Sequence, residues 1–162
     1  MALIVFFTCI LCSIIIWDFI KIQNLNKKII RKDEEIRKIN VNNSLLKDWL
    51  IVRQNGINLA DWLEVNGIHK IVIYGYGILG KAFFVEMQNS NVEVVAIADK
   101  NYKNIYANVP AVGIDSIPEC DAIIVSVINY YDEIEQQLVT KCRYPIISLE
   151  DVIYGVGYKF DE

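Results

Sequence analysis

The sequence has a single histidine, His69, and no second closely spaced pair among its four cysteines, so it lacks the paired ligands of a zinc site. Cys9 and Cys12 are the only closely spaced pair, and they stand among apolar residues. We therefore expect all four cysteines to be reduced thiols in a cytoplasmic setting. The chain also lacks basic excess, because 16 Lys and Arg face 20 Asp and Glu for a net charge of -4. This balance argues against nucleic-acid binding, which needs a basic face to neutralise phosphates.

The first twenty residues lack charge except at one position. Ala2 to Trp17 is uncharged, and Phe19 and Ile20 extend the run past Asp18. About nineteen apolar residues form roughly 28 Å of helix, close to the thickness of a hydrocarbon core. No basic segment precedes the run and no small-x-small cleavage signature follows it, which disfavours a signal peptide. The pattern predicts a transmembrane anchor at residues 1–20, with a buried core helix as the alternative.

Basic residues follow this run, and none precedes it. They are Lys21, Lys27, Lys28, Arg31, Lys32, Arg37 and Lys38. The positive-inside bias then predicts a single-pass protein of the cell membrane whose C-terminal domain is cytoplasmic. The same lysines and arginines would also suit the solvated face of a helix or anionic lipid headgroups.

Residues 21–66 form a predicted helical linker with a heptad repeat. Its a and d positions are Ile22, Leu25, Ile29, Ile36, Ile39, Leu46 and Leu50, interrupted by Lys32 and Asn43. About four heptads with a polar Asn at an a position predict a short coiled coil and a homodimer. The alternative is one amphipathic helix lying on the domain or on the membrane. We expect Trp49 and Trp62 to be packing residues.

With 162 residues and 54% hydrophobic content, the chain can bury one compact core. Short apolar runs predict a Rossmann-like domain at residues 67–154, followed by a tail at 155–162. The expected strands are Lys70 to Tyr74, Val92 to Ala98, Val109 to Val112, Ala122 to Val127 and Pro145 to Leu149. Right-handed crossovers then predict a five-stranded parallel sheet of order 3-2-1-4-5.

A glycine motif lies between the first strand and a predicted helix at Lys81 to Gln88. Its residues are Gly75, Tyr76, Gly77, Ile78, Leu79 and Gly80. In this context the motif predicts a nucleotide phosphate site, since amides at a helix start attract anions. Gly75 permits a tight turn, Gly77 lets a pyrophosphate approach, and Gly80 lets helix and strand pack closely. Lys81 is a candidate phosphate contact, or a lysine that points into solvent.

Asp99 follows the second strand, 19 positions after Gly80. This spacing is close to that of the acid that binds ribose hydroxyls in dinucleotide sites. An aspartate that caps the loop after a strand would look the same. The carboxylate disfavours a 2′-phosphate, although the neighbouring Lys100 weakens that argument.

Polar residues also end the fourth strand, which should lie beside the first. The crevice between these strands is where ligands sit in open α/β sheets. Ser126, Asn129 and Tyr130 should therefore face a ligand at the glycine turn. We expect Asp132 to cap the following helix.

Several segments together carry a family resemblance. They are Trp49-Leu50, Gln54-Asn55-Gly56, Trp62-Leu63, Gly67, Ile73 to Gly80, Asp121 to Val125 and Ile147 to Ile153. Across most of residues 45–154 the chain resembles small Rossmann-like modules of bacterial capsule and exopolysaccharide clusters. The glycine turn is also similar to the nucleotide-sugar-binding half of sugar O-acyltransferases and to sugar-nucleotide epimerases and dehydratases. The resemblance implies NAD or a nucleotide-sugar as ligand, and a glycosyltransferase as a partner.

Two family features are missing. Tyr154 is followed four positions later by Tyr158, so there is no Tyr-x-x-x-Lys pair, and no hexapeptide repeats follow the domain. We therefore expect no substrate domain. Three functions stay open: a membrane-tethered nucleotide or nucleotide-sugar binding module, an NAD-dependent sugar-nucleotide oxidoreductase or epimerase, and a ligand-free scaffold acting through the coiled coil. The enzyme would need Tyr130, Tyr131, Asp132 or a partner chain to supply an acid or base.

Overall fold

The computed structural model describes residues 1–157, apart from the side chains of residues 2–5, 8–14 and 157. The chain divides into two units, Met1–Asn40 and Val41–Glu162. The expected boundary at Gly67 therefore moves toward the N-terminus. The reason is that residues before Gly67 contribute Leu45, Trp49 and Leu59 to the same core as the sheet.

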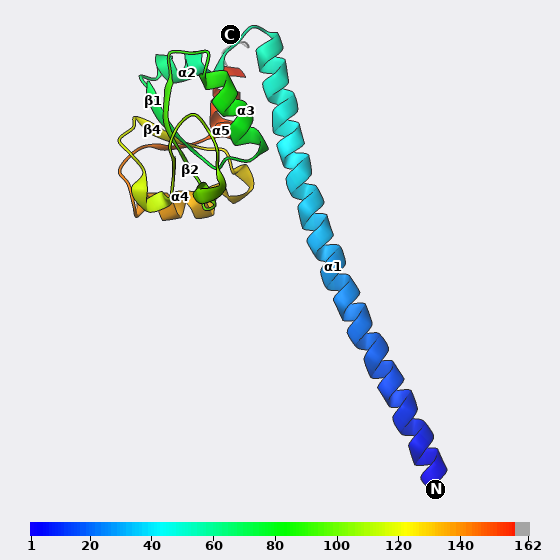
Figure 1. Ribbon diagram of the computed structural model, residues 1–162. Helices are drawn as coiled ribbons and strands as arrows, with labels where there is room; N and C mark the ends of the chain where they lie inside the picture. The colour runs from blue at the N-terminus through cyan, green and yellow to red at the C-terminus, as the bar shows by residue number, and fades with distance from the viewer. Residues whose placement is uncertain (158–162) are drawn as a thin grey trace. The chain divides into compact units, whose positions relative to one another are not determined.

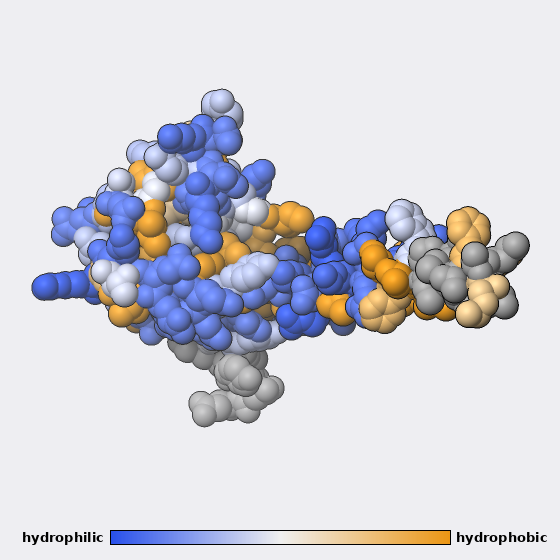
Figure 2. Space-filling model, turned by 90° about the horizontal axis from the view of Figure 1, so that it is seen from below, coloured by the Kyte–Doolittle hydropathy of each residue, from blue (hydrophilic) through white to orange (hydrophobic). Residues whose placement is uncertain are grey.

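Helix α1 spans Ala2–Gln54, and its first part makes up the N-terminal unit. Many apolar side chains of this unit are exposed, as Figure 2 shows along the helix. Within the described residues, no helix is long and apolar enough to cross a membrane. The side chains of residues 2–5 and 8–14, which belong to the expected anchor, lie outside those that are described.

The second unit contains the predicted parallel sheet, in the predicted order β3-β2-β1-β4-β5. The strands are β1 (Lys70–Tyr74), β2 (Glu93–Ala98), β3 (Ala111–Val112), β4 (Ala122–Val125) and β5 (Ile146–Ser148). β1 matches its expected bounds, while β3, β4 and β5 are shorter than predicted. Ser126 follows β4, and its amide still donates to Tyr74 O while its hydroxyl donates to Gly75 O.

Helices cover both faces of the sheet (Figure 1). One face packs on α2 (Leu59–Val65), α3 (Ile78–Met87), α5 (Leu149–Gly157) and the end of α1, and the other packs on α4 (Tyr131–Val139). Alternation along β1 sends Ile71 and Ile73 to the first face and Val72 and Tyr74 to the second. This two-layer burial explains why the strands read as continuous apolar runs.

The last turns of α1 belong to the body of the domain. Leu45, Trp49 and Val52 are buried, at spacings that place them on one helix face. The predicted heptad positions Leu46 and Leu50 lie to the side of this face, half-buried and exposed respectively. The packing expectation for Trp49 and Trp62 is confirmed, since both contact the core.

Helix α2 begins after Asn58, as expected, but the asparagine side chain makes no capping hydrogen bond. The amide of Leu59 instead donates to Oε1 of Glu86 on α3, at 2.8 Å. The helix ends at Val65, and Gly67, with a φ of 73° and the bond from Ile68 N to Leu63 O, forms the glycine stop after it. A cap from another helix therefore replaces the local one.

Residues 155–157, the first three of the predicted tail, are instead the last residues of helix α5. In α5, Leu149, Val152, Ile153 and Val156 are buried against the sheet. Their spacing follows the helical period. The segment after β5 is short, so this period is hard to recognise in the sequence alone. The helix packs closely on α2 where Gly155 meets the indole of Trp62.

Candidate functional site

The glycine turn links β1 to α3 at the carboxyl edge of the sheet. Gly75 has a φ of 93°, a region that favours glycine, and its amide donates to Ala98 O at 2.8 Å. A Cβ on Gly75 would overlap the Val127 side chain. Both conformation and space therefore require glycine at this position.

Gly77 and Gly80 meet different surroundings. A Cβ on Gly80 would overlap the carbonyl oxygen of Gly75, so helix and turn are in direct contact there. A Cβ on Gly77 would meet no atom within 4 Å, and Gly77 is the N-cap of α3 in an ordinary extended conformation. The backbone does not need glycine at Gly77. Its missing side chain leaves open space at the helix start.

Three further predicted site residues, Ser126, Leu79 and Ile78, lie in different surroundings. Ser126 is buried, and its hydroxyl lies 2.8 Å from Gly75 O and 3.2 Å from Tyr74 O. Its only proton therefore goes to the backbone at the turn, so Ser126 lies against the glycine turn and holds it in place. Leu79 is buried in the core, and Ile78 points to the surface with 73% of its area exposed.

Asp99 holds the turn from the end of β2. Its Oδ2 accepts the amide of Tyr76 at 2.9 Å, and its Oδ1 accepts the amide of Asn101 at 2.7 Å. Asp99 therefore caps the loop after β2, as one of the two interpretations of its position predicts. A carboxylate has about four acceptor positions, so two backbone bonds leave room for hydroxyl donors.

A cavity of about 300 Å³, here the α4 cavity, lies between the turn and helix α4. It is lined by Tyr74, Gly75, Asp99, Lys100, Asn101, Val127, Tyr130, Glu133, Ile134 and Gln137. The lining combines two tyrosines and two aliphatic side chains with two carboxylates, two amides and one lysine. These groups suit a ring system that carries polar edges.

A second cavity of about 540 Å³, here the α3 cavity, lies at the start of α3. Its lining is Tyr76, Gly77, Lys81, Asp99, Asn101, Asn104, Ile105 and Tyr106. The ammonium of Lys81 lies 5.6 Å from the centroid of the Tyr76 ring, which also packs edge-on against Phe84. Asp99 and Asn101 line both cavities, so the two share one wall.

Other residues predicted near the ligand lie elsewhere. The amide nitrogen of Asn129 donates to Asn42 Oδ1 at 3.1 Å, on α1, and Asn129 lines neither cavity. Asp132 lies in the first turn of α4 rather than at its N-cap, because a 3-10 turn at Ile128–Tyr130 shifts the helix start. The hydroxyl of Tyr131 reaches Glu135 at 3.0 Å and Ile146 O at 3.1 Å.

Sequence reasoning missed Asn101, Glu133 and Gln137. Glu133 and Gln137 are one helical turn apart and share a face of α4. A helix that follows the strand beside β1 must present one face to the crevice, so this pair carried a usable signal. The described residues contain no group of three or more His, Cys, Asp or Glu side chains that could hold a metal ion.

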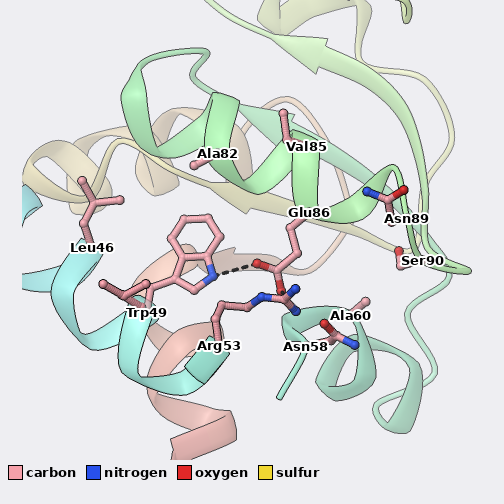
Figure 3. A pocket seen from close by; sticks show the side chains of 11 residues that line it. Leu46, Trp49, Arg53, Asn58, Ala60, Ala82, Val85, Glu86, Asn89 and Ser90 are labelled. Atoms are coloured by element: carbon pink, nitrogen blue, oxygen red, sulfur yellow. Dashed lines mark hydrogen bonds and ion pairs between the residues drawn. The ribbon is translucent and has the colours of Figure 1, made fainter. Parts of the chain in front are cut away.

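A groove of about 400 Å³ separates the end of α1 from α3 (Figure 3). At its base Glu86 accepts Trp49 Nε1 at 2.8 Å through Oε2, while Arg53 lies 3.5 Å from Oε1. With the Leu59 amide on the same oxygen, this nearly buried carboxylate connects three helices. The groove is thus organised around a structural ion pair, away from the glycine turn.

Comparisons with known proteins give no match. No protein-family model, no curated protein and no solved structure matches the chain. The function must therefore be argued from the site itself.

Proposed function

We propose that the chain is a nucleotide or nucleotide-sugar binding module. The observation that carries this proposal is the open space at Gly77, beside two glycines that the backbone does require. The N-cap position favours glycine over alanine only modestly, and the backbone at Gly77 does not require glycine. A phosphate approaching the backbone would explain it.

The phosphates would bind at the start of α3. A helix leaves its first amides without intrahelical acceptors, and Gly77 has no side chain to cap them. The helix dipole adds favourable potential for an anion. Lys81 on the rim of the α3 cavity supplies a mobile positive charge within reach of the same space.

The ribose and the base would extend into the α4 cavity. Asp99 lies on the wall between the cavities, where its free acceptor positions suit the ribose hydroxyls. A 2′-phosphate there would meet the carboxylate as a like charge, so an unphosphorylated ribose is favoured. Tyr130 and Ile134 offer faces for a base, and Gln137 offers polar atoms for its edge.

The membrane tether and the pathway belong to the same proposal. The apolar run at residues 1–20 would anchor the chain, with the binding domain at the inner leaflet. A role in surface polysaccharide synthesis, beside a glycosyltransferase, rests on the sequence resemblance. NAD or a nucleotide-sugar fits the proposed arrangement of phosphate, ribose and base.

Binding is favoured over catalysis by the positions of the acid and base candidates. The Tyr131 hydroxyl is bonded within the fold, and neither Tyr131 nor Asp132 lines the two cavities. Tyr130 alone among the three lines the α4 cavity. An oxidoreductase would need a second group that a partner supplies.

The test is thermal stabilisation of the purified full chain by UDP-glucose, UDP-N-acetylglucosamine and NAD. At least one should raise the melting temperature in proportion to its occupancy. Gly77→Val should abolish that shift without lowering the melting temperature of the free protein by more than a few degrees. Ile78→Val is the matched control and should retain the shift. Stabilisation that survives in Gly77→Val would refute the proposed site, and indifference to all nucleotides would refute the function.

A further inference from the structure

The N-terminal unit exposes a narrow apolar stripe along α1, here the a/d stripe. It consists of Ile22, Leu25, Ile29, Ile36 and Ile39, spaced three, four or seven residues apart. Each of these residues has between 49% and 57% of its surface area exposed. Such spacing aligns them on one side of the helix.

Polar residues occupy most of the remaining surface of this segment. Gln23, Lys27, Arg31, Glu34 and Lys38 stand at positions turned away from the a/d stripe. The apolar surface is therefore a seam about as wide as two-stranded coiled coils use, rather than the broader face of a helix packed on a globular core. The α1 residues that pack against the domain lie at other heptad positions, with Leu45 and Val52 at c and Trp49 at g.

Lys32 interrupts the stripe at a d position, but its charge is directed to the edge. Its Nζ lies 2.8 Å from Oε2 of Glu35 on the same helix. A lysine can lay its methylenes along an apolar seam while its ammonium stays in water. Lys32 therefore reduces the apolar area of the a/d stripe but still allows a second helix to pack there.

The charged flanks indicate which partner fits. With Ile22 at a, Lys28 occupies a g position and Asp33 the following e position. In a parallel in-register pair of identical helices, each g residue faces the next e residue of the other helix. Lys28 of each copy would then face Asp33 of the second copy. The stripe is thus complementary in charge to itself.

We propose that the a/d stripe binds a second copy of this chain as a parallel, in-register two-stranded coiled coil. Ile22, Ile29 and Ile36 at a with Leu25 at d are the choices that favour two strands. The proposal does not depend on nucleotide binding. It predicts that position 36 of one chain meets position 36 of the other.

Disulfide crosslinking of the full chain tests this geometry. In a background with Cys9→Ser and Cys12→Ser, Ile36→Cys should form a covalent dimer on mild oxidation. The matched control is Glu34→Cys, at the outward f position, which should crosslink several-fold less. Equal crosslinking at both positions, or none at position 36, would overturn the proposal, as an antiparallel pair or a helix on a membrane would predict.

Charge reversal tests the pairing independently. In the Ile36→Cys chain, Lys28→Glu or Asp33→Lys alone should lower the crosslinked fraction by about threefold, and the double change should restore it. Lys32→Leu should raise the fraction, because it completes the seam. Failure of the double reversal to recover crosslinking would contradict the parallel register.

Discussion

The hydroxyl of Ser126, which directly follows β4, donates a 2.8 Å hydrogen bond to the carbonyl oxygen of Gly75, the first residue of the glycine turn. The same carbonyl lies against Gly80, so three parts of the chain meet at one backbone group. This contact joins the start of α3 to the ends of β1 and β4. The turn is therefore pre-formed by the fold rather than by its own sequence alone.

Removing this contact should loosen the turn. Ser126→Ala leaves the Gly75 carbonyl without its donor and should lower the free energy of unfolding by about 1–2 kcal/mol. Any nucleotide response should weaken as well, because the amides at the start of α3 lose their fixed position. Urea unfolding with and without nucleotide measures both effects. Ser116→Ala, at an exposed position, should change neither.

The glycines of the turn should separate stability from binding. Gly80→Ala forces a Cβ into the Gly75 carbonyl and should cost about 1–3 kcal/mol of stability. Gly77→Ala enters open space and should cost about 1 kcal/mol or less, the usual difference between glycine and alanine at an N-cap. Thermal unfolding of the two variants, without nucleotide, makes the comparison. Equal losses would mean that Gly77 is also structural.

The sequence was sufficient for the order of the sheet and for the structural roles of Gly75 and Gly80. β-branched runs between turn signals set the five strands, and the handedness of crossovers set their order. Gly75 and Gly80 have the tight surroundings that their places in the motif predict. Patterns that depend on local chain geometry were therefore readable in advance.

Side-chain partners across the fold were not readable in this way. Ser126 and Asn129 follow a strand at the carboxyl edge of the sheet, and their polar atoms bond to Gly75 and Asn42. Glu86 accepts hydrogen bonds from α1 and α2, and no pattern in the sequence marks it for this role. Such partners lie tens of residues away, so only the folded chain brings them together.

Glu86 should be a main determinant of helix docking. Its carboxylate is nearly buried and accepts from Trp49 Nε1 and the Leu59 amide, so Glu86→Ala leaves both donors without it. We expect a loss of about 2–4 kcal/mol in the free energy of unfolding. Glu86→Gln should lose less, because it keeps one oxygen acceptor. Glu119→Ala, on the surface, should stay within about 0.5 kcal/mol of the parent in urea unfolding.

Substitutions at Gly155 and Trp62 should have strongly coupled effects on stability, because the two residues are in contact. A Cβ on Gly155 would lie 2.6 Å from Trp62 Nε1, so Gly155→Ala should separate α2 from α5 and cost about 1–3 kcal/mol. Trp62→Leu alone should also destabilise, because it removes packing area. In the double variant the alanine has room, and the combined loss should be smaller than the sum of the single losses. Additive losses would show that the helices adjust independently.

Tyr131 should give the domain a stability change at high pH. Burial, followed by the hydrogen bond to Glu135, raises the pKa of Tyr131 from 10.0 to about 12. Below pH 10 the phenol is neutral in both the folded and the unfolded chain, so its stabilising contribution is complete. Between pH 10 and 12 the unfolded chain loses the proton while the folded chain keeps it, and stability falls.

Urea unfolding across this range should show a shallower decline for Tyr131→Phe than for the parent. Tyr106→Phe, with a ring that is 93% exposed, should decline as the parent does. Parallel curves for the parent and Tyr131→Phe would mean that the Tyr131 phenol titrates in the folded chain as it does in the unfolded one.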